Sequence, residues 1–552
     1  IVAAGEGVMP QTLEHLDICS LLGVKRGGIV LTKTDLVDDE WLELVEDDVR
    51  SQVAGTFLAD APMMRFSAVE ERATPRLRSW LSDLVSAEEI SDRSPDRPFK
   101  LSVDRVFTMR GFGTVVTGTS AAGTIKVGDS VVVQPQGEEV RVRGIQVHGE
   151  TVERVEPGTR AAINLQGVDH DAVHRGDVLA GRGGLPRTLS FDGTLTALRR
   201  LTKPIKDRAK VLVHIGTAQI QGKVILIGRD HLKPGASVAV QVRLEHPTAI
   251  LPGEPYVIRG FEVLESYGKT LGGGQALSPS LRPLRRRSRD GAALVDALGT
   301  SDAEGMVDAY ATFAGGEGIA AGGLEVRLPA TRTQINAAVH ALRGRGVLIG
   351  NPKCLYPRAH IDALREQALA HIDDFHRSFP ARRGMGLEEL RSRLGVKLPA
   401  DVFNQLLDAL GEDVVRTEDL ISRQGFEARR TPAQEARCAR ILDALESAGL
   451  LPPRVQDLPE MLGLSEEEVA EGLELLFDER EAIRVSRELA YGGRSLAALQ
   501  ASLVAQLERD GTIDTAGLKA LTGASRKWTI PLGEYFDRIK LTIRVGDARR
   551  LR

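Results

Sequence analysis

The chain has 552 residues, of which 42% are hydrophobic and 27% charged, and its net charge is −4. This length calls for several domains, and the composition is ordinary for soluble globular protein. No apolar run reaches membrane-spanning length, and the negative net charge argues against uniform coating of nucleic acid, although a local basic surface stays possible. The three cysteines, Cys19, Cys354 and Cys438, lie far apart without paired spacing, which favours a reducing compartment over a disulfide or zinc framework.

Residues 1–92 alternate apolar strand-like runs with helical stretches, which predicts an α/β domain. The first run, Ile1 to Ala4, reads as the end of a buried strand. The 552 residues contain no Gly-x-x-x-x-Gly-Lys-Ser/Thr segment that would cradle phosphates and hold magnesium. We therefore expect the rear part of a nucleotide-binding domain, in a chain that is a fragment or an incomplete gene product.

The end of a second apolar run suits guanine chemistry. It closes on Thr32 and Lys33, and the carboxylate of Asp35 can accept hydrogen bonds from guanine N1–H and the 2-amino group. The Lys33 stem can lie along the base. Ser67 and Ala68, after a further apolar run, can offer backbone N–H groups to O6. Taken alone, the tetrapeptide at 32–35 reads as a solvated turn at the end of a strand, and the surrounding order of strands and helices reverses that reading in favour of the guanine site.

Short β-rich runs follow from Pro98 to Leu277, and Gly and Pro punctuate them about every ten residues, which is typical of small β-barrels. A break at 181–186 predicts two barrels, over residues 97–183 and 187–278.

The last third of the chain begins after a basic polar linker at 279–290. Short amphipathic helices then alternate with small β-hairpins, which predicts four winged helices of α+β type. Their expected ranges are 291–357, 358–430, 431–492 and 493–552. Trp528 and Tyr535 fall at i and i+7 of one helix, a spacing that indicates core positions.

The first barrel carries the sharpest likeness to a known family. Residues 104–119 read DRVFTMRGFGTVVTGT, and Gly123-x-Ile125-x-Val127-Gly128-Asp129 follows. This pattern resembles the second domain of elongation factor Tu and its relatives, and the segments at 174–179, 256–259 and 270–274 fall where that family closes its second and third domains. The fold that this resemblance implies is multidomain: part of an α/β P-loop GTPase domain, two β-barrels, and then the four winged helices.

The extension after the barrels, with segments 524–539 and 544–550, resembles the bacterial selenocysteine-specific elongation factors, and this likeness covers essentially the whole chain. It implies a GTPase that delivers selenocysteinyl-tRNA to a ribosome paused at UGA, with the tail gripping an mRNA hairpin. It also implies GTP and Mg²⁺ as cofactors, a cytoplasmic location, a monomer and no membrane partner. The family's Mg²⁺ ligands and its water-positioning histidine have no counterpart here, so no catalytic residue can be named. Thr32 stands where the family usually has Asn, whose amide ties the loop to the phosphate-binding loop.

The same resemblance places a selenocysteinyl pocket on the first barrel, at Asp104, Arg105 and Arg160. A selenolate is anionic at neutral pH whereas serine is neutral, so a discriminating pocket should be cationic. Arg105 and Arg160 can bind the selenolate, and Asp104 can orient an arginine or meet the amino group of the ester. Without the resemblance, surface ion pairs are the simpler reading.

The final unit is basic: residues 525–552 hold eight Lys and Arg against three Asp and Glu, a local charge of +5. The residues expected to bind mRNA are Ser525, Arg526 and Lys527 at a helix N-terminus, with Arg544 and Arg549 beside the wing turn. Such a cluster suits the backbone of an RNA hairpin and a base splayed from its loop. The alternative is a solvated basic tail.

Two other functions stay open at this point: a general translational GTPase that carries ordinary aminoacyl-tRNA, and a winged-helix DNA-binding regulator. The tail and the paired arginines disfavour the first, and the two barrels disfavour the second. The first three winged helices lack a comparable charge signal, so we expect them to act as spacers.

Overall fold

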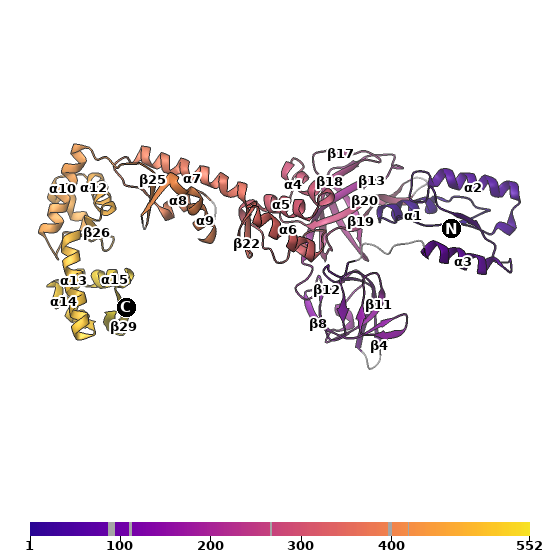
Figure 1. Cartoon of the computed structure of the whole chain (residues 1–552), viewed down its shortest axis with the longest axis horizontal. Coiled ribbons are helices and arrows are strands. Elements are labelled where there is room, and N and C mark those ends of the chain that lie inside the picture. Colours follow the sequence, from indigo (N-terminus) through magenta and orange to yellow (C-terminus); the bar gives the residue numbers. More distant parts are fainter. Residues whose placement is uncertain (87–93, 110–112, 265–267, 396–399, 418) are drawn as a thin grey trace. The chain divides into compact units, whose positions relative to one another are not determined.

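The computed structural model describes residues 1–86, 94–109, 113–264, 268–395, 400–417 and 419–552 (Figure 1). It divides into two compact units, Ile1–His360 and Ile361–Arg552. The expected domain border at residue 92 and residues 110–112 of the barrel motif lie outside the described residues. Within the described part, none of the helices combines the length and the apolar character needed to cross a membrane.

The first 86 residues form a small α/β layer, as predicted. Three parallel strands lie in the order β1-β2-β3, and Leu31 of the central strand is fully buried. Asp38 caps the second helix by accepting a 2.9 Å hydrogen bond from the backbone N–H of Trp41, and Val45 and Val49 turn its apolar face to the sheet. The elements are β1 (Val2–Ala3), α1 (Pro10–Leu21), β2 (Ile29–Thr32), α2 (Asp39–Val53), β3 (Met63–Arg65) and α3 (Ala73–Ser86).

The first barrel has six strands and closes because β11 pairs with both β5 and β8. Its strands are β4 (Lys100–Met109), β5 (Gly113–Ala122), β7 (Ser130–Gln134), β8 (Glu138–Val147), β11 (Arg160–Gln166) and β12 (Val178–Gly181), with the short β6 (Ile125–Lys126), β9 (Glu150–Val152) and β10 (Arg154–Val155) beside them. A Cβ on Gly118 would lie 2.3 Å from the carbonyl oxygen of Ser102 on the next strand. This glycine therefore permits the close strand contact that barrel closure needs.

The second barrel is also closed, in the order β13-β18-β16-β15-β19-β20. Its strands are β13 (Arg187–Ala197), β15 (Ala209–Ile215), β16 (Ala218–Leu226), β18 (Ser237–Ala249), β19 (Glu254–Leu264) and β20 (Gly268–Pro279), and β14 (Ile205–Lys206) pairs with β17 (His231–Leu232) at one end. Phe191 and Tyr256 fill its interior with ring centroids 4.9 Å apart.

A buried ion pair joins the two barrels. The Nζ atom of Lys100, on β4, lies 2.5 and 2.6 Å from the two carboxylate oxygens of Glu254, on β19, and also donates to the carbonyl of Ala249 at 3.1 Å. Lys100 is 1% exposed and Glu254 9%. The hydroxyl of Thr217, in the turn between β15 and β16, donates to the carbonyl of Val103 at 2.7 Å. These contacts link the start of β4 to two parts of the second barrel.

The segment expected as a solvated linker packs against the second barrel instead. Leu284 is 2% exposed; its N–H donates to Gln241 at 2.9 Å and its carbonyl accepts from Arg243 at 2.7 Å. The first winged helix then shares a hydrophobic cluster with Ile227 and Leu277 of the barrel. Composition conceals this because only two leucines, Leu281 and Leu284, anchor an otherwise basic segment of the described chain.

Four winged helices follow, as predicted, each with three helices and a β-hairpin. The first contains α4 (Arg289–Thr300), α5 (Ala303–Ala314), α6 (Arg332–Gly344), β21 (Leu348–Asn351) and β22 (Cys354–Pro357). The second contains α7 (Arg358–Ser378), β23 (Met385–Gly386), α8 (Leu387–Arg393), α9 (Ala400–Leu410), β24 (Val414–Thr417) and β25 (Leu420–Arg423). The third contains α10 (Pro432–Ser447), α11 (Leu458–Leu462), α12 (Glu466–Asp478), β26 (Ala482–Arg484) and β27 (Ala490–Gly492). The fourth contains α13 (Gly493–Asp510), β28 (Ile513–Asp514), α14 (Thr515–Thr522), α15 (Arg526–Arg538), β29 (Thr542–Val545) and β30 (Ala548–Leu551).

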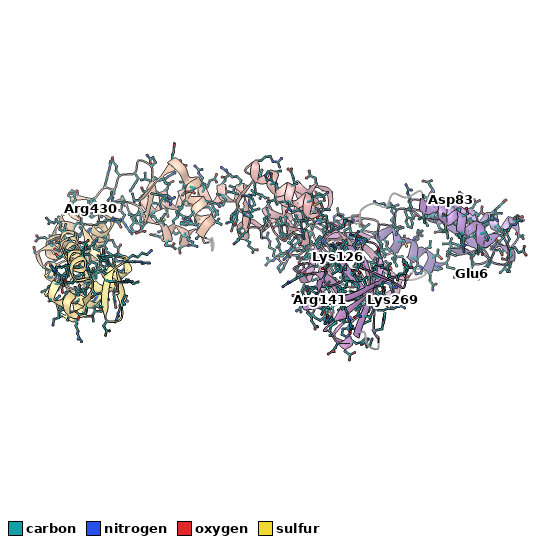
Figure 2. All side chains as sticks on the ribbon, turned by 60° about the horizontal axis from the view of Figure 1, so that its bottom comes forward. Glu6, Asp83, Lys126, Arg141, Lys269 and Arg430 are labelled. Atoms are coloured by element: carbon teal, nitrogen blue, oxygen red, sulfur yellow. The ribbon has the colours of Figure 1, made fainter. Side chains whose placement is uncertain are left out.

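The third and fourth winged helices are fused. Tyr491, on the hairpin of the third, lies in one hydrophobic cluster with Leu532 and Phe536 of the fourth. Glu446, near the end of α10, accepts hydrogen bonds from the backbone N–H groups of Arg494 and Ser495 at 2.9 and 3.1 Å and so caps α13. At the start of the third winged helix, Arg430, labelled in Figure 2, lies 2.9 Å from Glu479 at the end of α12.

Candidate functional site

Two loops at the carboxyl ends of β2 and β3 bring the residues expected at a guanine site together. The hydroxyl of Ser67 donates to the carboxylate of Asp35 at 2.5 Å, and Ser67 is 4% exposed while Asp35 and Ala68 are exposed. Lys33 adopts a left-handed backbone conformation, with φ of 56°, which turns the chain sharply between strand and loop. Ser67 therefore holds one carboxylate oxygen of Asp35, whose side chain is otherwise exposed.

Thr32 and Lys33 are tied to the neighbouring strand and its loop. The hydroxyl of Thr32 donates to the carbonyl of Val2 at 3.4 Å, and the ammonium of Lys33 lies 3.3 Å from Glu6. Both side chains of that ion pair are more than half exposed, so it contributes little to stability. An outward carboxylate beside a lysine stem fits a purine that carries two adjacent donors, which is guanine. Among the described residues, no group of three or more His, Cys, Asp or Glu side chains is placed to hold a metal ion.

On the first barrel, Asp104 and Arg160 form a two-pronged ion pair on the outer surface. The Nε and Nη2 atoms of Arg160 lie 3.1 and 3.0 Å from the two carboxylate oxygens, and Thr117 donates to the same carboxylate at 2.5 Å. A β-bulge between Val103 and Arg105 sets Asp104 out of the regular register. Asp104 therefore fixes the guanidinium plane of Arg160, which is one of the two roles expected of Asp104.

Arg105 lies on the same outer face. It pairs in register with Thr117, which pairs with Ala162, and directly opposed residues of antiparallel strands share a face. Arg105 is exposed, and among the described residues it has no ion pair or side-chain hydrogen bond. Since Asp104 neutralises Arg160, Arg105 supplies the net positive charge of this cluster. Thr117 was not expected at this site; its hydrogen bond to Asp104 and its register with Arg105 reveal it.

A groove of about 220 Å³ continues from this cluster across β5, β11 and β8. Asn164 and Ala162 follow Arg160 at alternate positions of β11, so the groove and the ion pair share one face. The Oδ1 atom of Asn164 is buried there without a hydrogen-bond partner among the described residues. The lining residues are Val115, Arg143, Gly144, Ile145, Gln146, Thr151, Ala162 and Asn164. Sequence reasoning missed this groove, and its one local signal was a polar Asn at an outward position of an apolar strand.

In the last winged helix, the start of α15 is open to solvent. Ser525 stands at the N-cap without a side-chain capping bond, and Arg526 and Lys527 are exposed. The ammonium of Lys527 lies 4.8 Å from the ring centre of Trp528. Trp528 and Tyr535 pack against the hydrophobic cluster of the last unit, which confirms their prediction as core residues.

The hairpin of this winged helix places its two arginines that are expected to contact RNA in different surroundings. Arg549 is 9% exposed, and its Nε lies 2.9 Å from a carboxylate oxygen of Asp537 on α15, so it holds the wing to the helix. Arg544 is exposed and donates a hydrogen bond to the carbonyl of Gly546 at 3.0 Å. The next residue, Arg550, is exposed on the other face of the hairpin. Because side chains alternate along β30, Arg549 is turned toward α15 and Arg550 toward solvent. Composition alone does not give the register of this strand.

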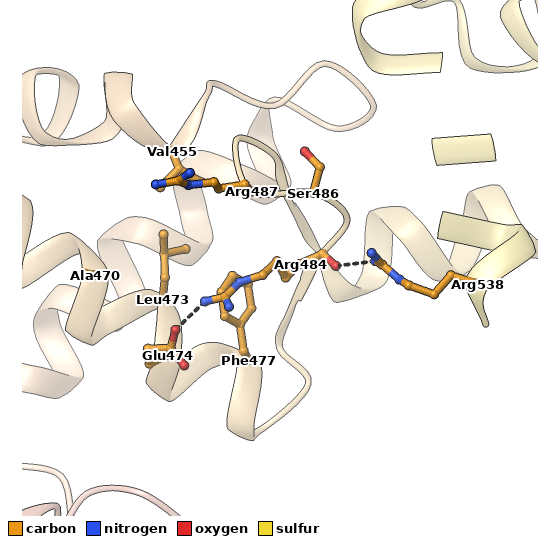
Figure 3. A pocket seen from close by; sticks show the side chains of 9 residues that line it. All are labelled: Val455, Ala470, Leu473, Glu474, Phe477, Arg484, Ser486, Arg487 and Arg538. Carbon is orange, nitrogen blue, oxygen red and sulfur yellow. Dashed lines mark hydrogen bonds and ion pairs between the residues drawn. The ribbon is translucent and has the colours of Figure 1, made fainter. Parts of the chain in front are cut away.

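A cavity of about 510 Å³ lies between α12 and the hairpin of the third winged helix (Figure 3). The guanidinium of Arg484 sits 4.7 Å above the ring of Phe477 and pairs with Glu474, while Arg538 donates to the carbonyls of Arg484 and Val485 at 3.3 and 3.0 Å. Two of its three arginines are therefore occupied by the protein. Residues 431–492 also hold fourteen Asp and Glu against six Lys and Arg, a charge of −8 that repels phosphate.

Four known domain descriptions match parts of the chain. Residues 1–87 match "Elongation factor Tu GTP binding domain" and residues 113–180 match "Elongation factor Tu domain 2". Residues 369–415 and 505–551 match two versions of "Elongation factor SelB, winged helix".

Whole proteins are similar over longer ranges. A selenocysteine-specific elongation factor of Desulfomicrobium baculatum is 33% identical over 557 aligned residues, which cover 100% of this chain and 87% of that protein. Elongation factor Tu 2 of Streptomyces avermitilis is 33% identical over 285 residues, covering 50% of this chain and 72% of its own length. The crystal structure of a bacterial selenocysteine-specific elongation factor has the same fold, with a TM-score of 0.59 over 100% of this chain and 85% of the other at 24% identity.

Proposed function

Because the chain belongs to the family of selenocysteine-specific elongation factors, we propose that it delivers selenocysteinyl-tRNA to the ribosome at UGA codons, in a GTP-dependent step. The observation that carries this proposal is the 33% identity across the complete chain, winged helices included. GTP is the nucleotide of its first domain, in which Thr32, Lys33, Asp35, Ser67 and Ala68 contact the guanine. Mg²⁺ accompanies the nucleotide phosphates in such enzymes and finds no ligand cluster among the described residues.

The outer cluster on the first barrel receives the aminoacyl group. Arg105 offers a cation that the protein leaves unpaired, and Arg160, held flat by Asp104, offers further N–H donors. A selenolate gains charge-assisted hydrogen bonds from both arginines, whereas the neutral hydroxyl of a seryl ester gains much less. Because the ester hangs from the terminal ribose of the tRNA, the base of that nucleotide falls into the adjoining groove beside Asn164.

The tRNA then lies along the second barrel. On the outer face of the β15–β16 hairpin, Lys210 stands directly opposite Lys223, and both are exposed. Two like charges at opposed positions destabilise a sheet, and an RNA phosphate between them offsets that cost.

The last winged helix binds the mRNA hairpin. Ser525, Arg526 and Lys527 present hydroxyl, guanidinium and ammonium groups at the start of α15, and Arg544 and Arg550 add exposed cations on the two opposite faces of the wing. The −8 charge of the third winged helix keeps RNA from that unit, so the hairpin is gripped at the end of the chain. The factor works as a monomer in the cytoplasm, with the ribosome as its other partner.

The proposal is tested by protection of the aminoacyl ester from hydrolysis, with selenocysteinyl-tRNA and seryl-tRNA compared side by side. Arg105→Gln should weaken selenocysteinyl-tRNA binding about tenfold or more, the loss of one charge-assisted hydrogen bond, and leave seryl-tRNA binding unchanged. Arg182→Gln, at an exposed arginine of the same barrel, is the matched control. Equal protection of the two esters by the unmodified chain would instead support a general carrier of aminoacyl-tRNA, which the half-length similarity to elongation factor Tu 2 makes the second candidate.

Hydrolysis and mRNA binding have their own tests. Since the chain has no phosphate-cradling segment, we propose that the 552 residues alone do not hydrolyse GTP; ribosome-stimulated turnover by the purified chain would refute this. For the tail, the chain should bind a selenoprotein mRNA hairpin more tightly than duplex DNA of equal charge, and equal affinity with identical salt slopes would remove the basis for an mRNA role.

A further inference from the structure

The first winged helix is held against both barrels by the residues that lead into its third helix, α6. Val326 packs against a hydrophobic cluster that contains Ala180 of the first barrel and Leu251 of the second. In the turn between β18 and β19, a Cβ on Gly253 would lie 3.0 Å from the side chain of Pro329. Residues 326–333, which we name the bracket segment, therefore lie where the two barrels meet.

The bracket segment also holds residues 94–97, through which the chain enters the first barrel. The backbone N–H of Arg332 donates to the carbonyl of Asp96 at 3.1 Å, and the N–H of Thr333 donates to the Asp96 carboxylate at 2.9 Å. Hydrogen bonds from the side chain and the backbone of Thr333 hold the pKa of Asp96 below its ordinary value. The guanidinium of Arg97 donates to the carbonyl of Pro252 in the β18–β19 turn. The entry to the first barrel is thus tied to the winged helix and to the second barrel at neighbouring residues.

These contacts complete the capping of α6 from outside its own winged helix. The first N–H groups of a helix have no partner within the helix. In α6 the N–H of Gln334 donates to the hydroxyl of Thr331 at 3.2 Å, and the two N–H groups before it donate to Asp96. The negative charge of Asp96 is favourable at this end of the helix dipole. The start of α6 therefore depends on a residue that lies more than two hundred positions earlier in the chain.

The same arrangement argues against a nucleic-acid site on this winged helix. In helix-turn-helix units, the N-terminal end of the recognition helix faces the nucleic acid. In the described structure the carboxylate of Asp96 takes that place, and its charge repels phosphate. Residues 291–357 hold six Asp and Glu against five Lys and Arg, a charge of −1, whereas residues 525–552 carry +5. The first winged helix therefore offers neither the open helix end nor the positive charge that suits RNA.

We propose that the first winged helix is an interdomain clamp rather than a nucleic-acid reader or a spacer. Through Asp96 it holds the entry to the first barrel, and through the rest of the bracket segment it holds the joint between the barrels. A turn of the first domain that pulls on residues 94–97 must then release the start of α6. Coupling of this kind is reciprocal, so loosening either side should loosen the other. The clamp does not depend on which RNA the chain carries.

Hydrogen exchange of the 552-residue chain tests the clamp from both sides. Asp96→Ala removes the carboxylate. Arg332→Pro removes one donated N–H and places proline at the first position of a helix, where it is well tolerated. The ion pair of Arg332 with Glu325 is lost as well, but the arginine side chain is 61% exposed, so this loss matters little. Asp302→Ala is the matched control, because Asp302 caps α5 of the same winged helix by accepting a 2.9 Å hydrogen bond from the backbone.

The two variants should act on both partners of the clamp. Asp96→Ala should speed exchange at the start of α6 about fivefold or more, as expected for the loss of a helix cap. Arg332→Pro should speed exchange about twofold or more in residues 94–101 and at Gly123, whose N–H donates to the carbonyl of Ser94 at 3.3 Å. Asp302→Ala should speed exchange only at the start of α5.

Two results would overturn the proposal. If Arg332→Pro leaves exchange of residues 94–101 and of Gly123 unchanged, the contact with Asp96 holds nothing beyond α6 itself. If a selenoprotein mRNA hairpin or duplex DNA of equal charge slows exchange at the start of α6 in the unmodified chain, the first winged helix is a nucleic-acid reader and not a clamp.

Discussion

The ion pair between Lys100 and Glu254 allows a sharp prediction about how the two barrels are held together. Lys100→Met replaces the side chain by an uncharged one of similar length. The carboxylate of Glu254 then keeps one hydrogen-bond donor among those described, the backbone N–H of Leu251 at 3.0 Å. Since Lys100 is 1% exposed and Glu254 9%, solvent cannot replace the lost ammonium. Breaking a buried pair on one side costs about 3–5 kcal/mol.

The double variant, Lys100→Met with Glu254→Gln, removes both charges. No carboxylate is then left unpaired, so we expect most of the lost free energy of unfolding to return. Replacing a whole buried ion pair by uncharged groups often changes stability little. Arg154→Gln breaks an exposed pair with Glu156 on the same barrel and serves as the control, with no measurable change expected.

Hydrogen exchange of peptides from β4 and β19 is the suitable assay, because a chain of many domains does not unfold in a single two-state transition. A loss of 3 kcal/mol in local opening free energy corresponds to exchange about a hundredfold faster in these strands. Exchange that rises less than tenfold in Lys100→Met, or a double variant no better protected than the single one, would refute the reasoning that an unpaired buried charge dominates this joint.

Three further outcomes follow from the same structure. Burial raises the pKa of Asp192 to about 6 from an ordinary 3.8, so its contribution to stability is present below pH 4 and is lost as the pH rises through 6. Asp192→Asn should therefore stabilise the second barrel by up to about 3 kcal/mol at pH 7.5 and not at pH 4, as measured by hydrogen exchange of peptides from β13 at both pH values. Arg549→Gln should lower the melting temperature of the last winged helix because it removes the ion pair with Asp537. Arg550→Gln should leave the melting temperature unchanged and weaken binding of the mRNA hairpin. The reverse pattern would show that Arg549, and not Arg550, contacts the RNA. Gly118→Ala should disrupt the first barrel, because its Cβ would lie 2.3 Å from the carbonyl oxygen of Ser102, and circular dichroism of a normally folded variant would contradict that contact.

Much of the fold was predictable because it rests on local pattern. The helix at Glu466–Asp478 is readable from local sequence, since Ser465 caps it in a capping box with Glu468 and its apolar residues recur at helical spacing. The barrel strands follow from β-branched residues at alternate positions, and the glycine-punctuated motif that begins at Asp104 pointed to the family.

The site was predictable only in part. Asp35 and Ser67 were expected at one site because both can hydrogen-bond a guanine. They meet at 2.5 Å because the parallel strands β2 and β3 end at the same edge of the sheet. The resemblance supplied Asp104, Arg105 and Arg160, but it did not show that Asp104 holds Arg160, nor that Arg105 has no ion pair within the described part of the chain.

The sequence by itself therefore determined the order and kind of the domains, because helix and strand periodicity, caps and turn residues act within a few positions of each other. The tertiary structure decided which charges are free. Arg549 is turned inward by the pairing of the last hairpin, and Leu284 anchors a segment that its neighbours make look like a solvated linker. These outcomes depend on strand register and on packing between residues far apart in the chain, and a single shift in register moves a side chain from the core to the surface.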